Sequence, residues 1–86
     1  MLVQLSLYTR TGCHLCEDME HALPELAEEL GFTTEIFPID NNPELERLYG
    51  SKVPVLMLGE QVICEYFLDK VALSKAINRY VNEKHT

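Results

Sequence analysis

The segment Cys13-His14-Leu15-Cys16 contains the residue types best suited to covalent chemistry in this chain. Alternating apolar residues precede it, and helical spacing begins at Leu15, so the pair is expected at the first turn of a helix. Side chains three residues apart are neighbours on a helix, and the free N–H groups at a helix start favour a thiolate. Arg10 adds a cation three residues before Cys13. A thiolate at Cys13 can attack a disulfide, and the thiol of Cys16 can then release the product.

Metal binding is the main alternative for this cysteine pair. A structural zinc site normally has four ligands, often from two Cys-x-x-Cys pairs. This chain has one such pair, together with Cys64 and three histidines that show no ligand spacing. A Cys-x-x-Cys pair between a strand and a helix of a β-α-β unit favours redox chemistry. We therefore predict that Cys13 and Cys16 are catalytic, that no metal is bound, and that Cys64 is a small buried residue.

Two hydrophobic periodicities divide the chain in the order β-α-β-α-β-β-α. Alternation and β-branched residues predict strands, and apolar residues three and four apart predict helices. The expected strands are residues 2–8, 33–39, 55–58 and 61–66, and the expected helices are residues 15–30, 43–50 and a segment after Asp69. A parallel β-α-β unit followed by a hairpin predicts an α/β fold with a four-stranded mixed sheet flanked by three helices.

Length and charge limit the domain organisation and the partners. A chain of 86 residues supports one hydrophobic core, so residues 1–86 are expected to form a single domain. The net charge of −7 disfavours a nucleic-acid surface and an anionic membrane face. No apolar run approaches the roughly 20 residues of a membrane-spanning helix, and the N-terminal residues lack the pattern of a signal peptide. We expect a cytoplasmic protein without nucleic-acid or membrane partners.

Two segments carry a resemblance to a known family. Residues 8–16 read Tyr-Thr-Arg-Thr-Gly-Cys-His-Leu-Cys, and residues 52–56 read Lys-Val-Pro-Val-Leu. They resemble the thioredoxin superfamily in its compact, glutaredoxin-like form, and are most similar to small bacterial glutaredoxin-like proteins with a Cys-His-Leu-Cys motif. The resemblance implies a minimal thioredoxin fold over nearly the whole chain. It also implies that Pro54 follows a cis bond and faces the cysteines, leaving the backbone of Val53 to pair with an extended substrate.

The resemblance extends to some of the residues that bind substrate. Arg10 matches the basic residue that glutaredoxins carry before their motif, and His14 is either an imidazolium that stabilises the thiolate or an exposed spacer. Arg10, His14, Val53 and Pro54 are therefore the candidate substrate-binding residues. Glutaredoxins also bind glutathione through two glycines and an acidic residue after the fourth strand. Residues 63–67 read Ile-Cys-Glu-Tyr-Phe instead, so we expect weak glutathione binding.

The combined prediction is a thiol–disulfide oxidoreductase or electron-transfer protein without an organic cofactor. The expected partners are disulfide-containing proteins or small thiols, with thioredoxin reductase or glutathione as the external reductant, and the chain is expected to be a monomer. Two other functions remain open. One is a carrier of a [2Fe–2S] cluster or another metal that uses Cys13 with external thiols, which visible absorbance would reveal. The other is an interaction module with vestigial cysteines, in which Cys13 would be unreactive.

Overall fold

The computed structural model describes residues 3–84 of the chain. The elements follow the predicted order, with bounds that lie within one residue of those expected. They are β1 (Val3–Thr9), α1 (His14–Leu30), β2 (Phe32–Pro38), α2 (Pro43–Tyr49), β3 (Val55–Leu58), β4 (Gln61–Glu65) and α3 (Lys70–Lys84). None of the helices within residues 3–84 is long and apolar enough to cross a membrane.

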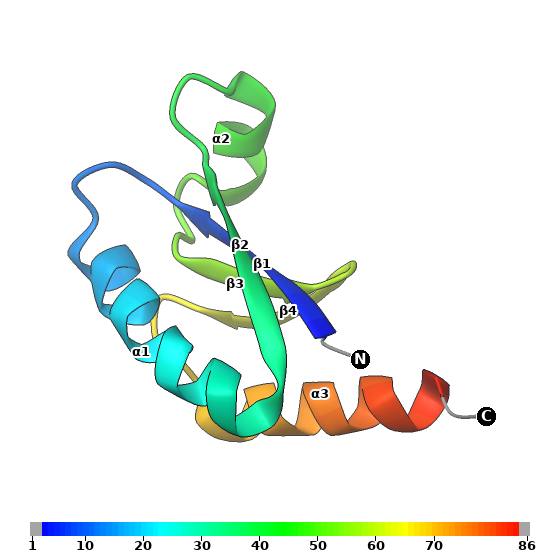
Figure 1. Cartoon of the computed structure of the whole chain (residues 1–86). Helices are drawn as coiled ribbons and strands as arrows, with labels where there is room; N and C mark the ends of the chain where they lie inside the picture. The colour runs from blue at the N-terminus through cyan, green and yellow to red at the C-terminus, as the bar shows by residue number, and fades with distance from the viewer. Residues whose placement is uncertain (1–2, 85–86) are drawn as a thin grey trace.

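The four strands form one mixed sheet in the order β2-β1-β3-β4. β1 is parallel to β2 and antiparallel to β3, while β3 and β4 form an antiparallel hairpin (Figure 1). The predicted α/β architecture is thus confirmed. Because β1 lies in the middle of the sheet, the loop that follows it emerges between β2 and β3.

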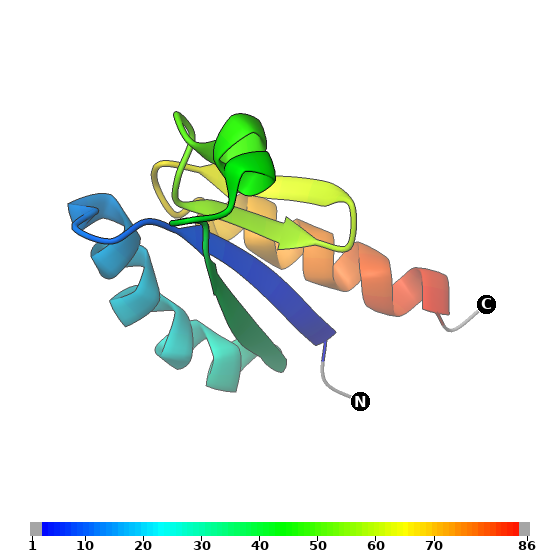
Figure 2. The same cartoon turned by 90° about the horizontal axis from the view of Figure 1, so that it is seen from above.

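Helices α1 and α3 pack on one face of this sheet. The alternate residues Val3, Leu5 and Leu7 of β1 are buried on that face. In Figure 2, which looks down from the side of α2, α3 passes behind the hairpin while α1 runs beside β2. Fully burying an aliphatic side chain contributes about 1.5–3 kcal/mol, so this layer supplies most of the apolar stabilisation. The core cluster comprises Val3, Leu5, Leu7, Met19, Leu23, Phe32, Leu56, Leu58, Cys64, Leu73, Ala76 and Ile77.

The short helix α2 lies on the other face of the sheet. It begins at Asn42, whose side-chain oxygen accepts a hydrogen bond from the N–H of Leu45 at 3.1 Å, and Pro43 occupies its first turn. The ring of Tyr49 stacks on that of Tyr8 with centroids 4.4 Å apart. No residue of α2 is fully buried, so the helix covers only the end of this face where β1 leads into the cysteine motif.

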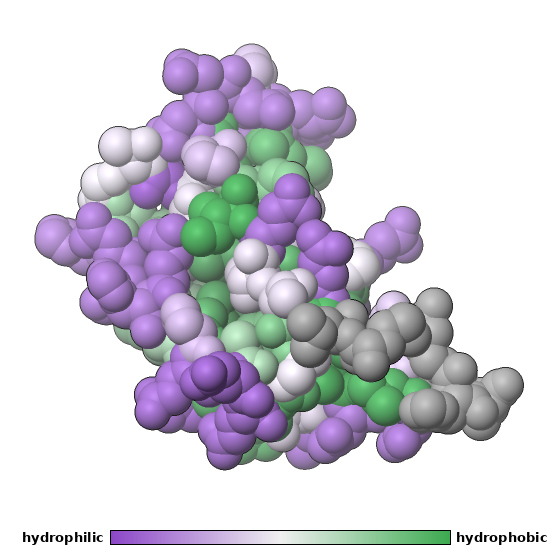
Figure 3. All heavy atoms as spheres, viewed as in Figure 1, coloured by the Kyte–Doolittle hydropathy of each residue, from purple (hydrophilic) through white to green (hydrophobic). Residues whose placement is uncertain are grey.

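Apolar side chains also reach the surface. Ile36 on the edge strand β2 is 45% exposed. Figure 3 shows green residues in the middle of the view, surrounded by hydrophilic side chains. A single exposed aliphatic residue on an edge strand is ordinary for a protein of this size.

The start of β2 and the end of β4 each differ from the predicted bound for an identifiable reason. β2 begins at Phe32 because Gly31, at φ 78°, reverses the chain immediately before it and brings Phe32 opposite Val3. β4 ends at Glu65 because Tyr66 takes a left-handed conformation at φ 66°. A strand cannot continue through such a residue.

Candidate active site

The ends of three strands lie side by side at the end of the sheet that carries the cysteine motif. β1 ends at Thr9, next to Tyr8, and Tyr8 pairs with Val55 at the start of β3. Val55 in turn pairs with Glu65, the last residue of β4. The sheet therefore places Pro54, which precedes Val55, beside the end of β1. The loops that follow β1 and β4 and the loop that precedes β3 converge there.

Cys13 and Cys16 are joined by a disulfide, with Cα atoms 5.2 Å apart. Cys13 is the N-cap residue of α1, and its Sγ accepts a hydrogen bond from the N–H of Cys16 at 3.1 Å. Gly12 adopts φ 77° in the turn that leads into the helix, a conformation that glycine reaches without strain. The sulfur of Cys13 thus lies where the free N–H groups of α1 point, and that position favours a thiolate once the disulfide is reduced.

The two cysteines of the pair differ in exposure. Cys13 is half-buried, whereas Cys16, in the first turn of α1, is 1% exposed. An incoming disulfide can therefore reach Cys13 and not Cys16. This difference agrees with the predicted roles of attacking and resolving thiol, which stay predictions.

The loop before Cys13 is fastened to the segment between β2 and α2. Both the backbone N–H and the hydroxyl of Thr11 donate hydrogen bonds to Oδ2 of Asp40, each at 3.0 Å. The hydrogen bond from the Thr11 backbone is the largest of the effects that hold the pKa of Asp40 below its ordinary value. The carboxylate thus orders a loop 29 residues away in sequence.

Arg10 and His14 have different neighbours. The guanidinium of Arg10 lies over the last turn of α2, where a Cβ on Gly50 would come within 3.2 Å of its Nη2. Its charge also helps to lower the pKa of Asp40. The side chain of His14 is 96% exposed, and its Nδ1 lies 3.8 Å from Oε2 of Glu17. The exposed position fits the spacer interpretation of His14. An imidazolium there would form an ion pair with the Glu17 carboxylate.

Val53 and Pro54 are joined by a cis peptide bond, as the resemblance implied. Pro54 is buried, and its C=O accepts a hydrogen bond from the N–H of Tyr66 at 2.9 Å. Within residues 3–84 the backbone of Val53 has no hydrogen-bonded partner. These backbone groups are therefore available to a bound segment, and the role of Val53 and Pro54 in substrate binding stays a prediction.

Cys64 lies apart from the disulfide. It is 8% exposed and belongs to the core cluster under α3, as predicted. Burial raises the pKa of its thiol, so the thiol stays protonated and is a poor nucleophile. In the part of the chain that the structure describes, no three His, Cys, Asp or Glu side chains are grouped as metal ligands would be.

The hydrophobic periodicity did not predict that Tyr66 and Phe67 would form a surface beside the motif. Tyr66 and Phe67 follow β4, and the structure places them across a cleft from Leu15 and Met19 of α1. Phe67 is 69% exposed. The sequence signal for this surface is the resemblance, which matches residues 63–67 to the stretch after the fourth strand where glutaredoxins bind glutathione.

Comparisons with known proteins agree with this architecture. Residues 4–78 match the family described as "Glutaredoxin-like domain (DUF836)". An uncharacterized protein of Mycobacterium tuberculosis is 37% identical, in an alignment that covers 88% of this chain and 84% of that protein.

Solved structures show the same fold. The solution structure of a protein from Nitrosomonas europaea is 41% identical, with a TM-score of 0.76 over 85% of this chain and 88% of that one. Thioredoxin O1 of Arabidopsis thaliana, in its oxidized state, superposes with a TM-score of 0.60 at 21% identity, over 91% of this chain and 77% of that one. The latter shows the thioredoxin fold alone.

Proposed function

This chain belongs to the family of glutaredoxin-like domains, and on that basis we propose that it is a thiol–disulfide oxidoreductase that passes two electrons between Cys13 and Cys16 and a substrate disulfide. The observation that carries the proposal is the difference in solvent exposure between the two cysteines at the start of α1. Cys13 is accessible and caps the helix, while Cys16 is 1% exposed directly behind it. That arrangement supplies a nucleophile and a resolving thiol within one helical turn.

The reaction runs through two thiol–disulfide exchanges. The thiolate of Cys13 attacks one sulfur of the substrate disulfide, an S–S bond forms between them, and the other substrate sulfur leaves as a thiolate that takes a proton from solvent. Cys16 loses its proton and attacks Sγ of Cys13, and the second substrate thiol is released. The substrate gains two electrons, and the protein ends with the Cys13–Cys16 disulfide. A dithiol, or two thiols, from an external reductant then restores the reduced pair.

Chain elements beside the disulfide would orient the substrate. The unpaired backbone groups of Val53 can add an extended substrate segment as a short strand next to Cys13. The loop that carries Cys13 is held by the hydrogen bonds from Thr11 to Asp40. A fixed loop lowers the entropic cost of bringing the two sulfurs into line.

Trapping the mixed disulfide tests the proposal. Reduced Cys16→Ser protein incubated with insulin should form a covalent adduct through Cys13, whereas Cys13→Ser should form little, because its remaining thiol at Cys16 is buried. Mass spectrometry measures the adduct, and the double variant Cys13→Ser/Cys16→Ser is the control for reaction at Cys64. Equal trapping by the two single variants, or trapping by Cys13→Ser alone, would overturn the assignment.

The reduction potential of the Cys13–Cys16 pair decides the direction of electron flow. A value near −270 mV, as in thioredoxin, would make the protein a reductant, and a value near −120 mV would make it an oxidant. Equilibration with a thiol buffer of known potential, followed by alkylation and mass spectrometry, measures it. A Cys13 that never exchanges with the buffer in the folded protein would contradict a redox function.

A further inference from the structure

An apolar groove of 270 Å³ begins at the cysteine motif and runs along the first turns of α1. One wall consists of Leu15, Met19 and Ala22, which are spaced as one face of the helix. The opposite wall is the loop after β4, with Tyr66, Phe67 and Leu68. Leu15 lies between the two cysteines in sequence, so the groove begins within one helical turn of the disulfide.

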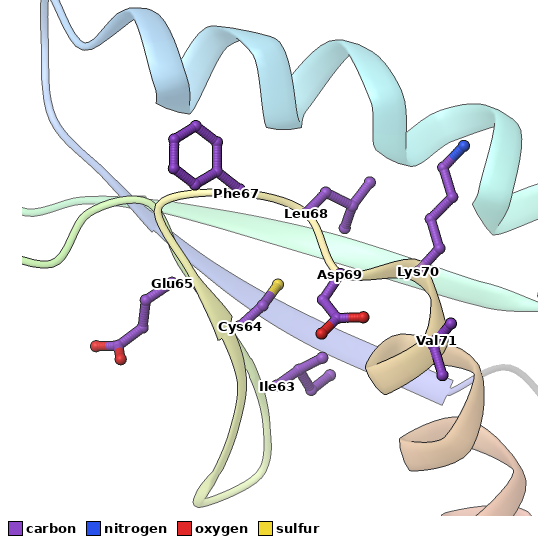
Figure 4. Close-up of a pocket in the computed structure, with 8 residues that line it drawn as sticks. All are labelled: Ile63, Cys64, Glu65, Phe67, Leu68, Asp69, Lys70 and Val71. Carbon is purple, nitrogen blue, oxygen red and sulfur yellow. The ribbon is translucent and has the colours of Figure 1, made fainter.

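The loop side of the groove presents apolar surface to solvent. Phe67 is 69% exposed and Tyr66 is 43% exposed, although both are large aromatic residues. Figure 4 shows Phe67 and Leu68 directed from the loop toward α1. A second, open hollow of 670 Å³ on the other side of the loop shares Phe67 and Leu68 with the groove and adds Val71, which is 64% exposed. Contiguous exposed apolar side chains of this kind mark an interaction surface.

Hydrogen bonds hold the loop in this position. The N–H of Tyr66 donates to the C=O of Pro54 at 2.9 Å, and its hydroxyl donates to the C=O of Ser51 at 2.7 Å. Tyr66 is also held at φ 66°, a conformation that is costly for a residue other than glycine. These hydrogen bonds connect the loop to the segment before β3, and Phe67 extends from the loop across the groove from Leu15.

The charges around the groove favour a cationic partner. Asp18 lines the groove, and Glu65 and Asp69 line the adjoining hollow. Lys70, which borders both, is the one cation among the lining residues. Three carboxylates against one ammonium group attract a basic side chain and disfavour a small anion such as glutathione.

We propose that this groove binds the segment of a protein substrate next to its reacting cysteine, and that it selects an apolar side chain followed by a basic one. The inference rests on the proposed oxidoreductase function and names its substrate class. A second copy of the chain is a poorer occupant, because each copy carries a net charge of −7 and two acidic rims would face one another.

Single-turnover reduction of matched peptides tests the groove. In one disulfide-linked peptide the cysteine is flanked on both sides by Leu and then Lys, and in the other by Ser and then Glu. The protein is reduced beforehand, so its own dithiol supplies both electrons. Each rate is divided by the rate of the same peptide with dithiothreitol, which removes differences in intrinsic reactivity. Bis(2-hydroxyethyl) disulfide, which is too small to fill the groove, reports the chemistry of the cysteine pair alone.

We expect the Leu/Lys peptide to react at least about tenfold faster than the Ser/Glu peptide, which corresponds to about 1.4 kcal/mol. Phe67→Ser should reduce this preference by about threefold or more without altering the net charge. Asp18→Lys should also reduce the preference for the Leu/Lys peptide, because the new cation repels the lysine of that peptide. The matched control is Val62→Ser, because Val62 is a 46% exposed apolar residue of β4 outside the groove, and it should retain the wild-type preference.

The outcomes separate the groove from the chemistry. Equal rates for the two peptides, together with rapid reduction of bis(2-hydroxyethyl) disulfide, would contradict substrate selection by the groove and would still support the oxidoreductase function. Failure to reduce any of the three compounds would overturn both. Self-association that Phe67→Ser abolishes, measured by sedimentation, would assign the surface to a second copy and overturn the proposal. So would faster reaction with glutathione disulfide than with the Leu/Lys peptide.

Discussion

Cys13, Cys16 and Cys64 have the same side chain, but the fold places each in different surroundings. Cys13 is the N-cap residue of α1 and accepts a hydrogen bond from a helix N–H, Cys16 is buried in the first turn, and Cys64 lies in the core under α3. Helix N–H groups favour the thiolate, whereas burial in apolar surroundings disfavours it. Position in the fold therefore gives Cys13 surroundings that favour a thiolate and gives Cys64 surroundings that disfavour it.

At the residue scale, Cys64→Ala should leave the redox chemistry intact. Burial raises the pKa of this thiol, so it contributes no thiolate near neutral pH. The substitution removes one buried sulfur and should lower the free energy of unfolding by about 1 kcal/mol. Urea denaturation measures the stability, and alkylation of the native, oxidized wild type by iodoacetamide should be slow. A folded Cys64→Ala protein that no longer reduces disulfides would reveal a third redox cysteine.

Asp40 should give the folded protein a distinct sensitivity to acid. Hydrogen bonds, first that of the Thr11 backbone, hold its pKa in the folded state below the value of about 3.9 expected in an unfolded chain. The carboxylate therefore stabilises the fold fully above the unfolded pKa, and this contribution is lost as the pH falls through the lower folded pKa. Asp40→Asn should thus be less stable than the wild type at pH 7, and the difference should shrink below about pH 4.

Melting temperatures measured by circular dichroism between pH 7 and pH 2.5 would test this. Thr11→Val is the matched control, since it removes the hydroxyl donor and keeps the backbone donor, and it should preserve most of the pH dependence. A difference between the wild type and Asp40→Asn that stays constant across this pH range would contradict the account.

At the scale of the elements, the three helices begin in the same way. Cys13, Asn42 and Asp69 each accept a hydrogen bond from the N–H three residues later, at 3.1, 3.1 and 3.0 Å. Asparagine and aspartate are the usual residues at this position. Cys13 therefore occupies the N-cap position of α1, so the N–H that caps the start of the helix is one that would stabilise a thiolate at Cys13 once the disulfide is reduced.

The cap of α3 should be important for the whole fold, because α3 supplies Leu73, Ala76 and Ile77 to the core. Asp69→Ala leaves the N–H of Ala72 without its partner and should lower the free energy of unfolding by about 1 kcal/mol. Asp69→Asn keeps a capping oxygen and should stay within about 0.5 kcal/mol of the wild type. Urea denaturation compares the variants, and equal stability of the Ala and Asn variants would show that the cap contributes nothing.

At the scale of the whole molecule, the net charge of −7 affects every charged partner. It repels anions at long range, and salt screens the repulsion because the Debye length falls from about 30 Å at 0.01 M to about 8 Å at 0.15 M ionic strength. Short-range contacts at the disulfide are screened much less. The salt dependence of a reaction rate thus distinguishes the long-range effect of the net charge from the short-range contacts at the disulfide.

The reduced protein should therefore react faster with glutathione disulfide as salt is added, by about two- to fivefold between 0.01 and 0.15 M. Cystamine, a cationic disulfide of similar reactivity, should show the opposite trend. Stopped-flow measurement of the second-order rate constants tests the pair of predictions, with the neutral bis(2-hydroxyethyl) disulfide as the control. Trends of the same sign for the anionic and cationic compounds would contradict them.

The sequence alone determined the features that depend on neighbours along the chain. Alternation in β1, helical spacing after Leu15 and the Asn42-Pro43 start of α2 are local signals, so they predicted the element order and placed Cys13 at a helix start. The parallel and antiparallel strand pairings followed, because short connections and right-handed crossovers allow few arrangements.

Only the tertiary structure decided which residues that are far apart in the sequence contact one another. The tie from Thr11 to Asp40 spans 29 residues, and the hydrogen bond from Tyr66 to Ser51 spans 15, and neither has a periodic signature. The left-handed conformation of Tyr66 and the exposure of Phe67 likewise left no trace in the hydrophobic pattern. Such contacts are set by how α1, α3 and the strand ends pack together, because packing selects among the many conformations that local preferences leave open to a loop.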